Sequence, residues 1–389
     1  MLTYKCLLRY STALLAMMLA MLAVLPAHAQ DEFTLGDMRV VYDRGYFDTD
    51  TLKGDVSDIR FYSGNSYFGS SDRLVLDYEL ASGVFKLNTF LIEGLRISDE
   101  GLNVYMESMS IENMIIDDQV LDQAFLESDA GVKVYNSGEI KINDIDIEAE
   151  GSRISLSELY ISDIPILPYQ NSYIPDYDSE IYIDRLTIAL SPYDPSLAEY
   201  HMMLNSLGIN DITVNMSSIS SHRNVGDRYR QISNAEIQLV GLGAFESYGD
   251  IEYLKQTYHM LNENDFENVD PSQALLVLSS FGGGIFINSF ELSYTDRGFM
   301  DYAFTLAGQF SGMARDDIAD LAVMSIQGEL MQFPDIADLI IPPIERFIRR
   351  GGRIVISAEP KISLPIISYL PLIESPSDAI NVLGVRVTN

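Results

Sequence analysis

The stretch that decides the fold is IKINDIDIEAE at Ile140–Glu150, with ISLSELYIS following at Ile154–Ser162. Apolar side chains alternate with polar or acidic ones in both segments, which is the period of a β-strand with one dry face and one wet face. The same pattern recurs in IYIDRLTIAL at Ile181–Leu190, GINDITVNM at Gly208–Met216 and NAEIQLVGL at Asn234–Leu242. Strands repeated in series in this way predict a long curved antiparallel sheet.

The alternation changes phase once inside the first of these segments. Ile140 and Ile142 stand on one parity, whereas Ile145 and Ile147 stand on the other. A one-residue slip inside a strand is what a β-bulge accommodates. The sequence therefore predicts a bulge at Asn143–Asp144.

Helical spacing is concentrated in the second half of the chain. Apolar residues at i, i+3 and i+4 predict helices over Ser196–Leu207, Ile251–Leu261, Phe299–Phe310, Asp316–Leu330, Ile336–Ile348 and from Ser375. Pro342-Pro343 lies inside the fifth of them, so we expect a sharp kink or two short helices there. The predicted fold class is β-dominated α+β, with helices packed mainly in the C-terminal half. The expected division is a signal peptide at 1–29, a β-rich repeat-like domain at 30–195 and an α+β domain at 196–389.

The N-terminus has the three parts of a secretory signal peptide. Lys5 and Arg9 supply positive charge, Ala13–Leu25 is apolar, and Ala27-His28-Ala29 is a small-x-small cleavage site. Cleavage after Ala29 leaves no retained transmembrane segment, because no later apolar run approaches about 18 residues. The expected location is the periplasm, a part of the cell envelope, with secretion to the medium as the alternative.

The amino-acid composition argues against several classes of binding partner and against thiol chemistry. The chain has 25 Lys and Arg against 57 Asp and Glu, a formal net charge of −32. This acidic protein should repel nucleic acid and anionic headgroups. Its single cysteine, Cys6, lies in the predicted signal peptide, so the processed chain has no thiol for disulfides, metal ligation or nucleophilic attack.

Two clusters of charged residues are candidate binding sites. Carboxylates in the loop and strand around residue 180 form a weak Ca²⁺ candidate, although they lack the order and the glycine of an EF-hand loop; they are Asp176, Asp178, Glu180 and Asp184. The alternative is a solvated acidic loop. The concentrated basic patch is a candidate grip for phosphate or carboxylate groups, or else a set of cations that stabilise a helix C-terminus; it comprises Arg346, Arg349, Arg350 and Arg353.

No catalytic constellation is evident in the sequence, and we expect no cofactor. The histidines beyond the signal peptide are His201, His222 and His259, which have no partners at ligand spacing. Ser221 and His222 are adjacent in a predicted strand, so their side chains should point to opposite faces. A periplasmic hydrolase would need these histidines and the acids to converge in one cleft.

The C-terminal half resembles uncharacterised exported proteins of alphaproteobacteria. The residues that carry this are LNSLGINDITV at Leu204–Val214, FELSYTDRGFMDYAF at Phe290–Phe304, IERFIRRGGRIVISAEP at Ile344–Pro360 and NVLGVRVTN at Asn381–Asn389. The N-terminal half loosely resembles the AsmA-like, β-rich envelope proteins. The resemblance implies a long curved sheet in the periplasm and gives no catalytic residues to carry over.

These observations favour a non-catalytic envelope protein that binds a lipid or another apolar ligand on the inner face of its sheet. An apolar sheet face must be covered by helices, another sheet or a ligand, and few helices are predicted in residues 30–195. The alternative is a structural or assembly factor that binds other envelope proteins through a sheet edge or its acidic surface. A hydrolase ranks third.

Overall fold

The computed structural model describes residues 32–35, 38–48, 53–81, 84–99, 101–117, 134–165, 174–193, 197–206, 208–258 and 282–389. The chain divides into two compact units, unit 1 at Met1–Ile174 and unit 2 at Pro175–Asn389. The division therefore falls before the strand Tyr177–Ala189, earlier in the chain than the sequence placed it. The predicted signal peptide and His259 lie outside the described residues.

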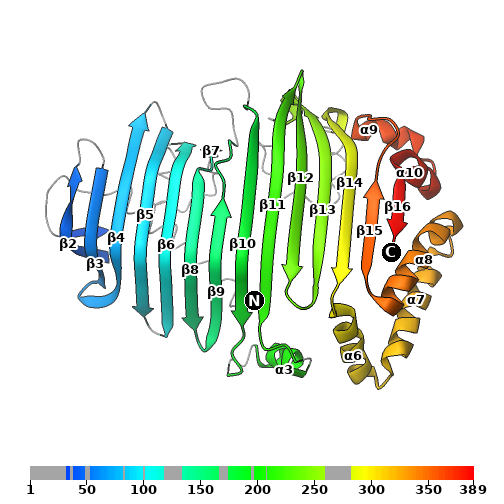
Figure 1. The fold of residues 1–389 in the computed structure, drawn as a ribbon, viewed down its shortest axis with the longest axis horizontal. Coiled ribbons are helices and arrows are strands. Elements are labelled where there is room, and N and C mark those ends of the chain that lie inside the picture. The colour runs from blue at the N-terminus through cyan, green and yellow to red at the C-terminus, as the bar shows by residue number, and fades with distance from the viewer. Residues whose placement is uncertain are drawn as a thin grey trace. The chain divides into compact units, whose positions relative to one another are not determined.

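Unit 1 is an antiparallel sheet in which strands that follow one another in the chain lie side by side (Figure 1). Its strands are β1 Glu32–Leu35, β2 Met38–Asp48, β3 Lys53–Ser63, β4 Ser66–Ala81, β5 Val84–Asp99, β6 Leu102–Asp117, β7 Val134–Asn136, β8 Glu139–Ala149 and β9 Ser152–Ile161. The short strand β7 also pairs with β6, beside β8. Gly64, Gly101 and Gly151 have positive φ at three of the turns, a conformation that costs glycine little.

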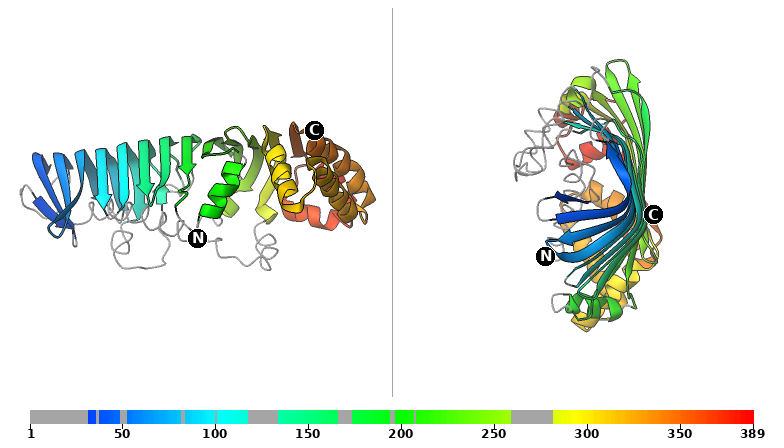
Figure 2. Two further views of the ribbon diagram at one scale, coloured as in Figure 1. Left: turned by 90° about the horizontal axis from the view of Figure 1, so that it is seen from below. Right: turned by 90° about the vertical axis from the view of Figure 1, so that its left-hand side faces the viewer.

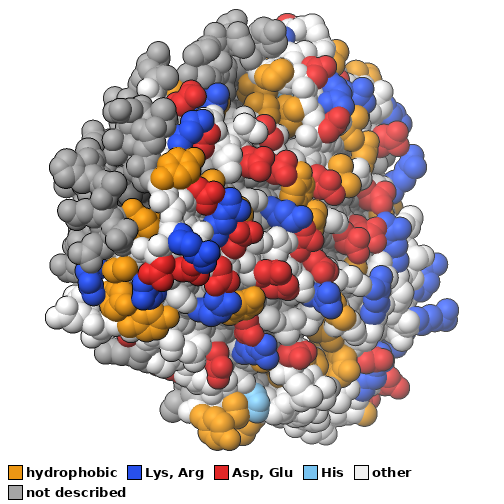
Figure 3. Space-filling model, turned by 60° about the vertical axis from the view of Figure 1, so that its left-hand side comes forward, with side chains coloured by type: hydrophobic (Ala, Val, Ile, Leu, Met, Phe, Trp, Pro, Cys, Tyr) orange, Lys and Arg blue, Asp and Glu red, His pale blue; other side chains and the backbone are white. Residues whose placement is uncertain are grey.

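The core of unit 1 is formed by one face of this sheet. Phe61, Phe85 and Phe90 are among its most buried side chains, and they pack with aliphatic residues of β2 to β6. The opposite face is polar, and cross-strand ion pairs such as Arg73–Asp55 and Arg96–Asp72 connect its strands. Acidic and basic side chains are interspersed in the view that brings this end of the chain forward (Figure 3).

A row of residues crosses the strands of unit 1 where the in–out alternation inverts. In a regular strand, the residues buried on one face are two apart. Across this row they are three apart, which shows that the same face stays buried on both sides of it. The pairs are Val56/Ile59, Ser71/Leu74, Ile92/Leu95 and Met106/Met109. The cross-strand register places these residues opposite one another in what we call the inversion row: Asp43, Asp58, Asp72, Gly94, Glu107, Asp144 and Ser157. Three of them, Asp58, Gly94 and Asp144, have positive φ.

The bulge predicted at Asn143–Asp144 is wrong, although the phase change is real. On either side of Asp144, Asn143 pairs with Glu158 and Ile145 pairs with Leu156, so the register continues unshifted. No extra residue is needed, because the neighbouring strands invert their alternation at the same level. A left-handed φ of 45° at Asp144 inverts the alternation in β8.

Unit 2 continues the serial antiparallel pattern and adds helices. Its strands are β10 Tyr177–Ala189, β11 Ile212–Val225, β12 Arg228–Leu239, β13 Gly243–Leu254, β14 Ile285–Asp296, β15 Arg353–Ala358 and β16 Val385–Thr388. Its helices are α3 Ala198–Ser206, η2 Gly282–Gly284, α6 Phe299–Ser311, α7 Arg315–Leu330, α8 Pro334–Arg350, α9 Ile366–Tyr369, η3 Leu370–Leu372 and α10 Pro376–Leu383. Strands of the sheet bend along their length (Figure 2). The predicted β-dominated class with helices mainly in the C-terminal half is confirmed.

Two local predictions in unit 2 are wrong. The helix predicted from Ile251 begins only at Lys255 and is helical to Tyr258, where the described residues pause. Ile251 to Leu254 instead end strand β13, because pairing with both β12 and β14 outweighs their helical spacing. Helix α8 is one continuous helix across Pro342 and Pro343, so the alternative of two short helices is also wrong. Its apolar side packs on α7, β15 and β16, and this packing offsets the hydrogen bonds that the prolines cannot make.

The start of α10 shows how closely a helix boundary can follow the sequence. Ser375 is the N-cap, and its hydroxyl accepts a hydrogen bond from the backbone N–H of Asp378. The Asp378 carboxylate in turn accepts from the backbone N–H of Ser375, which completes a capping box before Pro376. Among the described residues, no helix is long and apolar enough to span a membrane.

The positive φ angles in the inversion row lead to a testable prediction about protein stability. Gly94→Ala should lower the free energy of unfolding by about 1–2 kcal/mol or more, because an L-residue resists positive φ and the new Cβ would meet the Asp72 carboxylate. Asp144→Gly, at the same level of β8, should be neutral or stabilising. Urea denaturation of both variants checks this, and equal losses in the two would contradict it.

Candidate functional site

The candidate binding surface is a partly exposed apolar face of the sheet in unit 2. Five large apolar side chains on β12 to β15 point to this face, and each is between 40 and 46% exposed. We call them the apolar face: Ile237, Phe245, Phe290, Leu292 and Ile356. Single exposed apolar residues are ordinary on protein surfaces, whereas contiguous ones mark binding sites.

Strand register brings these residues together. Leu292 of β14 pairs directly with Ile356 of β15, and Phe290 lies two residues from Leu292 on the same side of its strand. Phe245 of β13 pairs with Ile237 of β12 on one side and with Tyr294 of β14 on the other. The apolar face is thus continuous over four neighbouring strands, which are spaced about 4.8 Å apart.

Helix α8 covers only one end of the apolar face. The Phe347 ring of α8 is buried edge-on against Tyr294, with ring centroids 5.8 Å apart, and Tyr294 in turn packs on Phe245 at 4.5 Å. Burial raises the pKa of the Tyr294 hydroxyl to about 12, with the nearby Asp296 carboxylate as a further cause. Farther along the strands, Leu292 and Ile356 remain exposed.

The four arginines of the predicted basic patch do not form a single binding site in the structure. Arg349 of α8 donates to Asp320 of α7 at 2.5 Å and to Glu345 at 3.0 Å, so it joins two helices. Arg353 begins β15 and binds Glu246 at 2.8 Å on the polar side of the sheet. Arg346 and Arg350 are exposed in the last turns of α8, where cations suit the helix C-terminus.

The acidic residues near β10 are engaged by neighbours on β11. Asp176 accepts hydrogen bonds from the backbone and side chain of Asn224, which hold its pKa below the usual range. Asp178 pairs with Arg223. Glu180 lies within β10, and Asp184 pairs with Arg185 next to it. Within the described ranges, no group of three or more His, Cys, Asp or Glu residues is arranged to hold a metal ion.

His222 is the histidine with the most unusual surroundings. It is 1% exposed, and its ring lies 4.9 Å from that of Tyr177, 4.7 Å from Tyr229 and 5.2 Å from Tyr258, measured between centroids. Neither ring nitrogen has a hydrogen-bond partner in the described part of the chain. His201, in contrast, contacts the Asn205 amide within α3. This aromatic cluster could not be found from the sequence, because its tyrosines come from separate elements of the fold.

The comparisons with known proteins cover only part of the chain. A family model whose description is "Uncharacterized protein" matches residues 236–389. This range contains β13 to β16, helices α6 to α10 and all five residues of the apolar face. No curated protein matches the chain.

His222 should make unfolding sensitive to acid. Burial lowers its pKa from 6.5 to about 4, although Asp176 partly opposes this shift. The unfolded chain therefore binds a proton between these two pH values while the folded protein does not, and stability should fall as the pH falls through that window. The full penalty below pH 4 is about 3 kcal/mol, at about 1.4 kcal/mol for each pH unit.

Replacement of the imidazole tests this directly. His222→Phe should show a smaller loss of unfolding free energy than the unaltered protein between pH 6.5 and about pH 4. His201→Gln serves as the control and should keep the full loss. Chemical denaturation at several pH values measures the difference, and parallel curves for His222→Phe and the unaltered protein would rule out this role.

Proposed function

We propose that this protein is a non-catalytic binding protein that holds an apolar ligand, such as the acyl chain of a lipid, against the apolar face of unit 2. The observation that carries the proposal is the continuous exposure of Phe245, Phe290, Leu292 and Ile356 on neighbouring strands. Complete burial of a fully exposed apolar side chain contributes about 1.5–3 kcal/mol. Because each of these side chains is 40 to 46% exposed, covering one of them contributes about 1 kcal/mol, and a chain laid over several of them gains several kcal/mol.

The proposed ligand site lies in a different part of the chain from the one that the sequence favoured. The few predicted helices in residues 30–195 pointed to a ligand on the N-terminal strands, yet the corresponding apolar residues of unit 1 are buried. Unit 2, which carries most of the helices, leaves apolar residues of neighbouring strands exposed side by side. The predicted signal peptide and the resemblance of the N-terminal half to AsmA-like proteins support a periplasmic setting for this role in lipid binding.

A second candidate function is the assembly role, in which another envelope protein covers the same apolar face. The motivating observation is again the exposure of these residues, because protein interfaces also bury apolar cores. In-cell crosslinking through a photoreactive residue at position 292 separates the two. A protein adduct would favour assembly, and crosslinked lipid would favour the binding protein.

Leu292→Asp should weaken ligand binding if the apolar face is the site. With dansyl-labelled undecanoic acid as the fluorescent probe, the affinity should fall at least about tenfold, because a charged group would be buried under the chain. Ile219→Asp is a matched control, since Ile219 is an exposed isoleucine on the polar face of β11. Equal affinities for Leu292→Asp and the unaltered protein would refute the site.

A further inference from the structure

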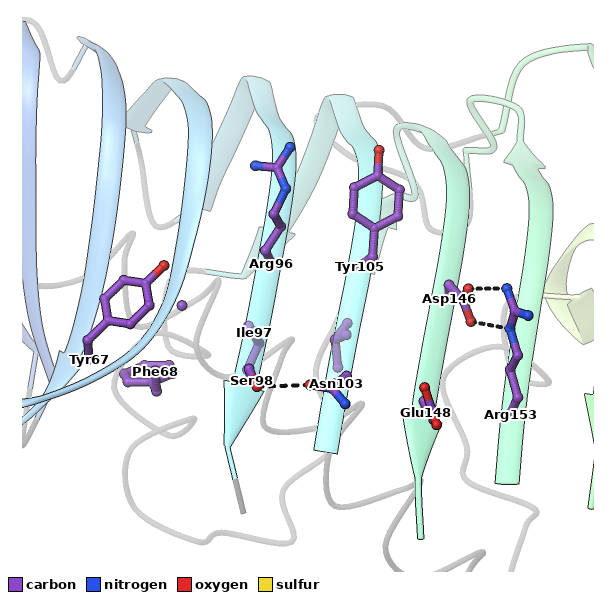
Figure 4. A pocket seen from close by; sticks show the side chains of 12 residues that line it. Tyr67, Phe68, Arg96, Ile97, Ser98, Asn103, Tyr105, Asp146, Glu148 and Arg153 are labelled. Carbon is purple, nitrogen blue, oxygen red and sulfur yellow. Dashed lines mark hydrogen bonds and ion pairs between the residues drawn. The ribbon is translucent and has the colours of Figure 1, made fainter. Parts of the chain in front are cut away.

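A trough lies at one end of the sheet of unit 1, where charged and polar side chains line it together with Phe68, Ile97 and Val104. Its volume is about 510 Å³, and it spans the ends of β4, β5, β6, β8 and β9 (Figure 4). Two rows of side chains form its floor, because Arg96 pairs with Tyr105 and Tyr105 with Asp146, while Ser98 pairs with Asn103 and Glu148 with Arg153. Everything that lines the trough belongs to unit 1.

Two tyrosines provide flat surfaces in the trough. Tyr67 is 56% exposed and Tyr105 is 40% exposed, and they lie on either side of Arg96 (Figure 4). The guanidinium carbon of Arg96 lies 5.8 Å from the centre of the Tyr105 ring. Tyrosine offers a large rigid surface with a polar hydroxyl at little cost in conformational entropy, which suits it to ligand contacts.

Hydrogen-bonding groups surround these rings. The Ser98 hydroxyl donates to the side-chain oxygen of Asn103 at 2.8 Å, so the Asn103 amide nitrogen retains its own donors for a ligand. Nε of Arg153 donates to Asp146 at 2.8 Å, and this pairing holds both planar groups at the floor of the trough. Glu148 adds a carboxylate to the second row, between Asn103 and Arg153.

The charged groups around the trough indicate which classes of ligand it can bind. Arg96 is neutralised by Asp72, with 2.9 Å between the nearest atoms, and Arg153 is neutralised by Asp146. With Glu148 in addition, the surroundings favour no anion, which argues against a phosphate or carboxylate ligand. The trough is open to solvent, so an acyl chain laid in it would not be enclosed as it is in a typical apolar pocket.

We propose that this trough binds a neutral oligosaccharide. The C–H faces of sugar rings carry slight positive charge and pack well on the negative faces of the exposed Tyr67 and Tyr105 rings. Sugar hydroxyls both donate and accept, which matches the amide of Asn103 and the paired guanidinium and carboxylate groups of Arg153 and Asp146. This inference does not depend on the apolar face, which belongs to unit 2.

The test is ligand-observed NMR and calorimetry on the full processed chain. The probes are maltotetraose, cellotetraose and chitotetraose at up to about 10 mM, which covers weak millimolar binding. We expect at least one of them to bind. Tyr105→Ala and Tyr67→Ala should each weaken that binding about tenfold, which corresponds to the 1–2 kcal/mol typical of an aromatic contact at an interface. Tyr105→Phe, which keeps the ring, should bind within about threefold of the unaltered protein.

Tyr46→Ala is the matched control, because Tyr46 is an exposed tyrosine on β2 that does not line the trough. Its affinity for the bound sugar should be unchanged. Absence of binding to all three tetrasaccharides would overturn the proposal, as would binding that survives both Tyr67→Ala and Tyr105→Ala. Circular dichroism on each variant confirms that these exposed substitutions leave the sheet intact.

Discussion

The constraint on which unit 1 depends is that one face of every strand must stay dry even where the in–out alternation inverts. A strand that changed phase alone would turn its apolar side chains to the solvent beyond that point. Here the neighbouring strands change phase at the same level, so Val56 and Ile59 of β3 remain buried on the same face, as do Met106 and Met109 of β6. The hydrogen-bonded register is unbroken at Asp144 for the same reason.

The inversion row also concentrates negative charge in a protein that already has a net charge of −32. Part of this charge is met by arginines one residue away on neighbouring strands, as in the pairs Arg44–Asp58 and Arg60–Asp43. Glu107 and Asp144 instead face each other, and a hydrogen bond to Asp144 together with its charge raises the pKa of Glu107. Aspartate tolerates left-handed φ better than most residues, which explains why an acid occupies this position despite the repulsion.

Much of the fold could be predicted from the sequence, because the spacing of apolar residues along the chain indicates many of its strands and helices. The alternation in β8 and β9, the helix starting after Ser375 and the strand RIVISA at β15 depend on neighbouring residues only. Strand β13 could not be predicted, since Ile251 and Leu254 satisfy helical spacing and only their pairing with two flanking strands decides the matter. The same holds for α8, where tertiary packing outweighs the prolines.

The candidate sites were harder to predict, because adjacency in sequence is a poor guide to adjacency on a sheet. Arg349 and Arg353 are four residues apart, yet one joins α7 to α8 and the other lies on the polar side of β15. Conversely, Leu292 and Ile356 are distant in sequence and pair directly. Only the register reveals such surfaces, both the apolar face of unit 2 and the trough of unit 1.

Two chemically opposite surfaces follow from one repeated design. Each strand contributes an apolar side and a polar side. Serial antiparallel pairing places the apolar sides of neighbouring strands on one face of the sheet and their polar sides on the other. Where the apolar side is left partly uncovered, as around Leu292, it suits an apolar ligand. Where the polar side carries exposed aromatic rings, as around Tyr105, it suits a ligand rich in hydroxyl groups. Because the two surfaces belong to different units, substitutions can be confined to one surface at a time, and the two proposed binding functions can be tested separately in one protein.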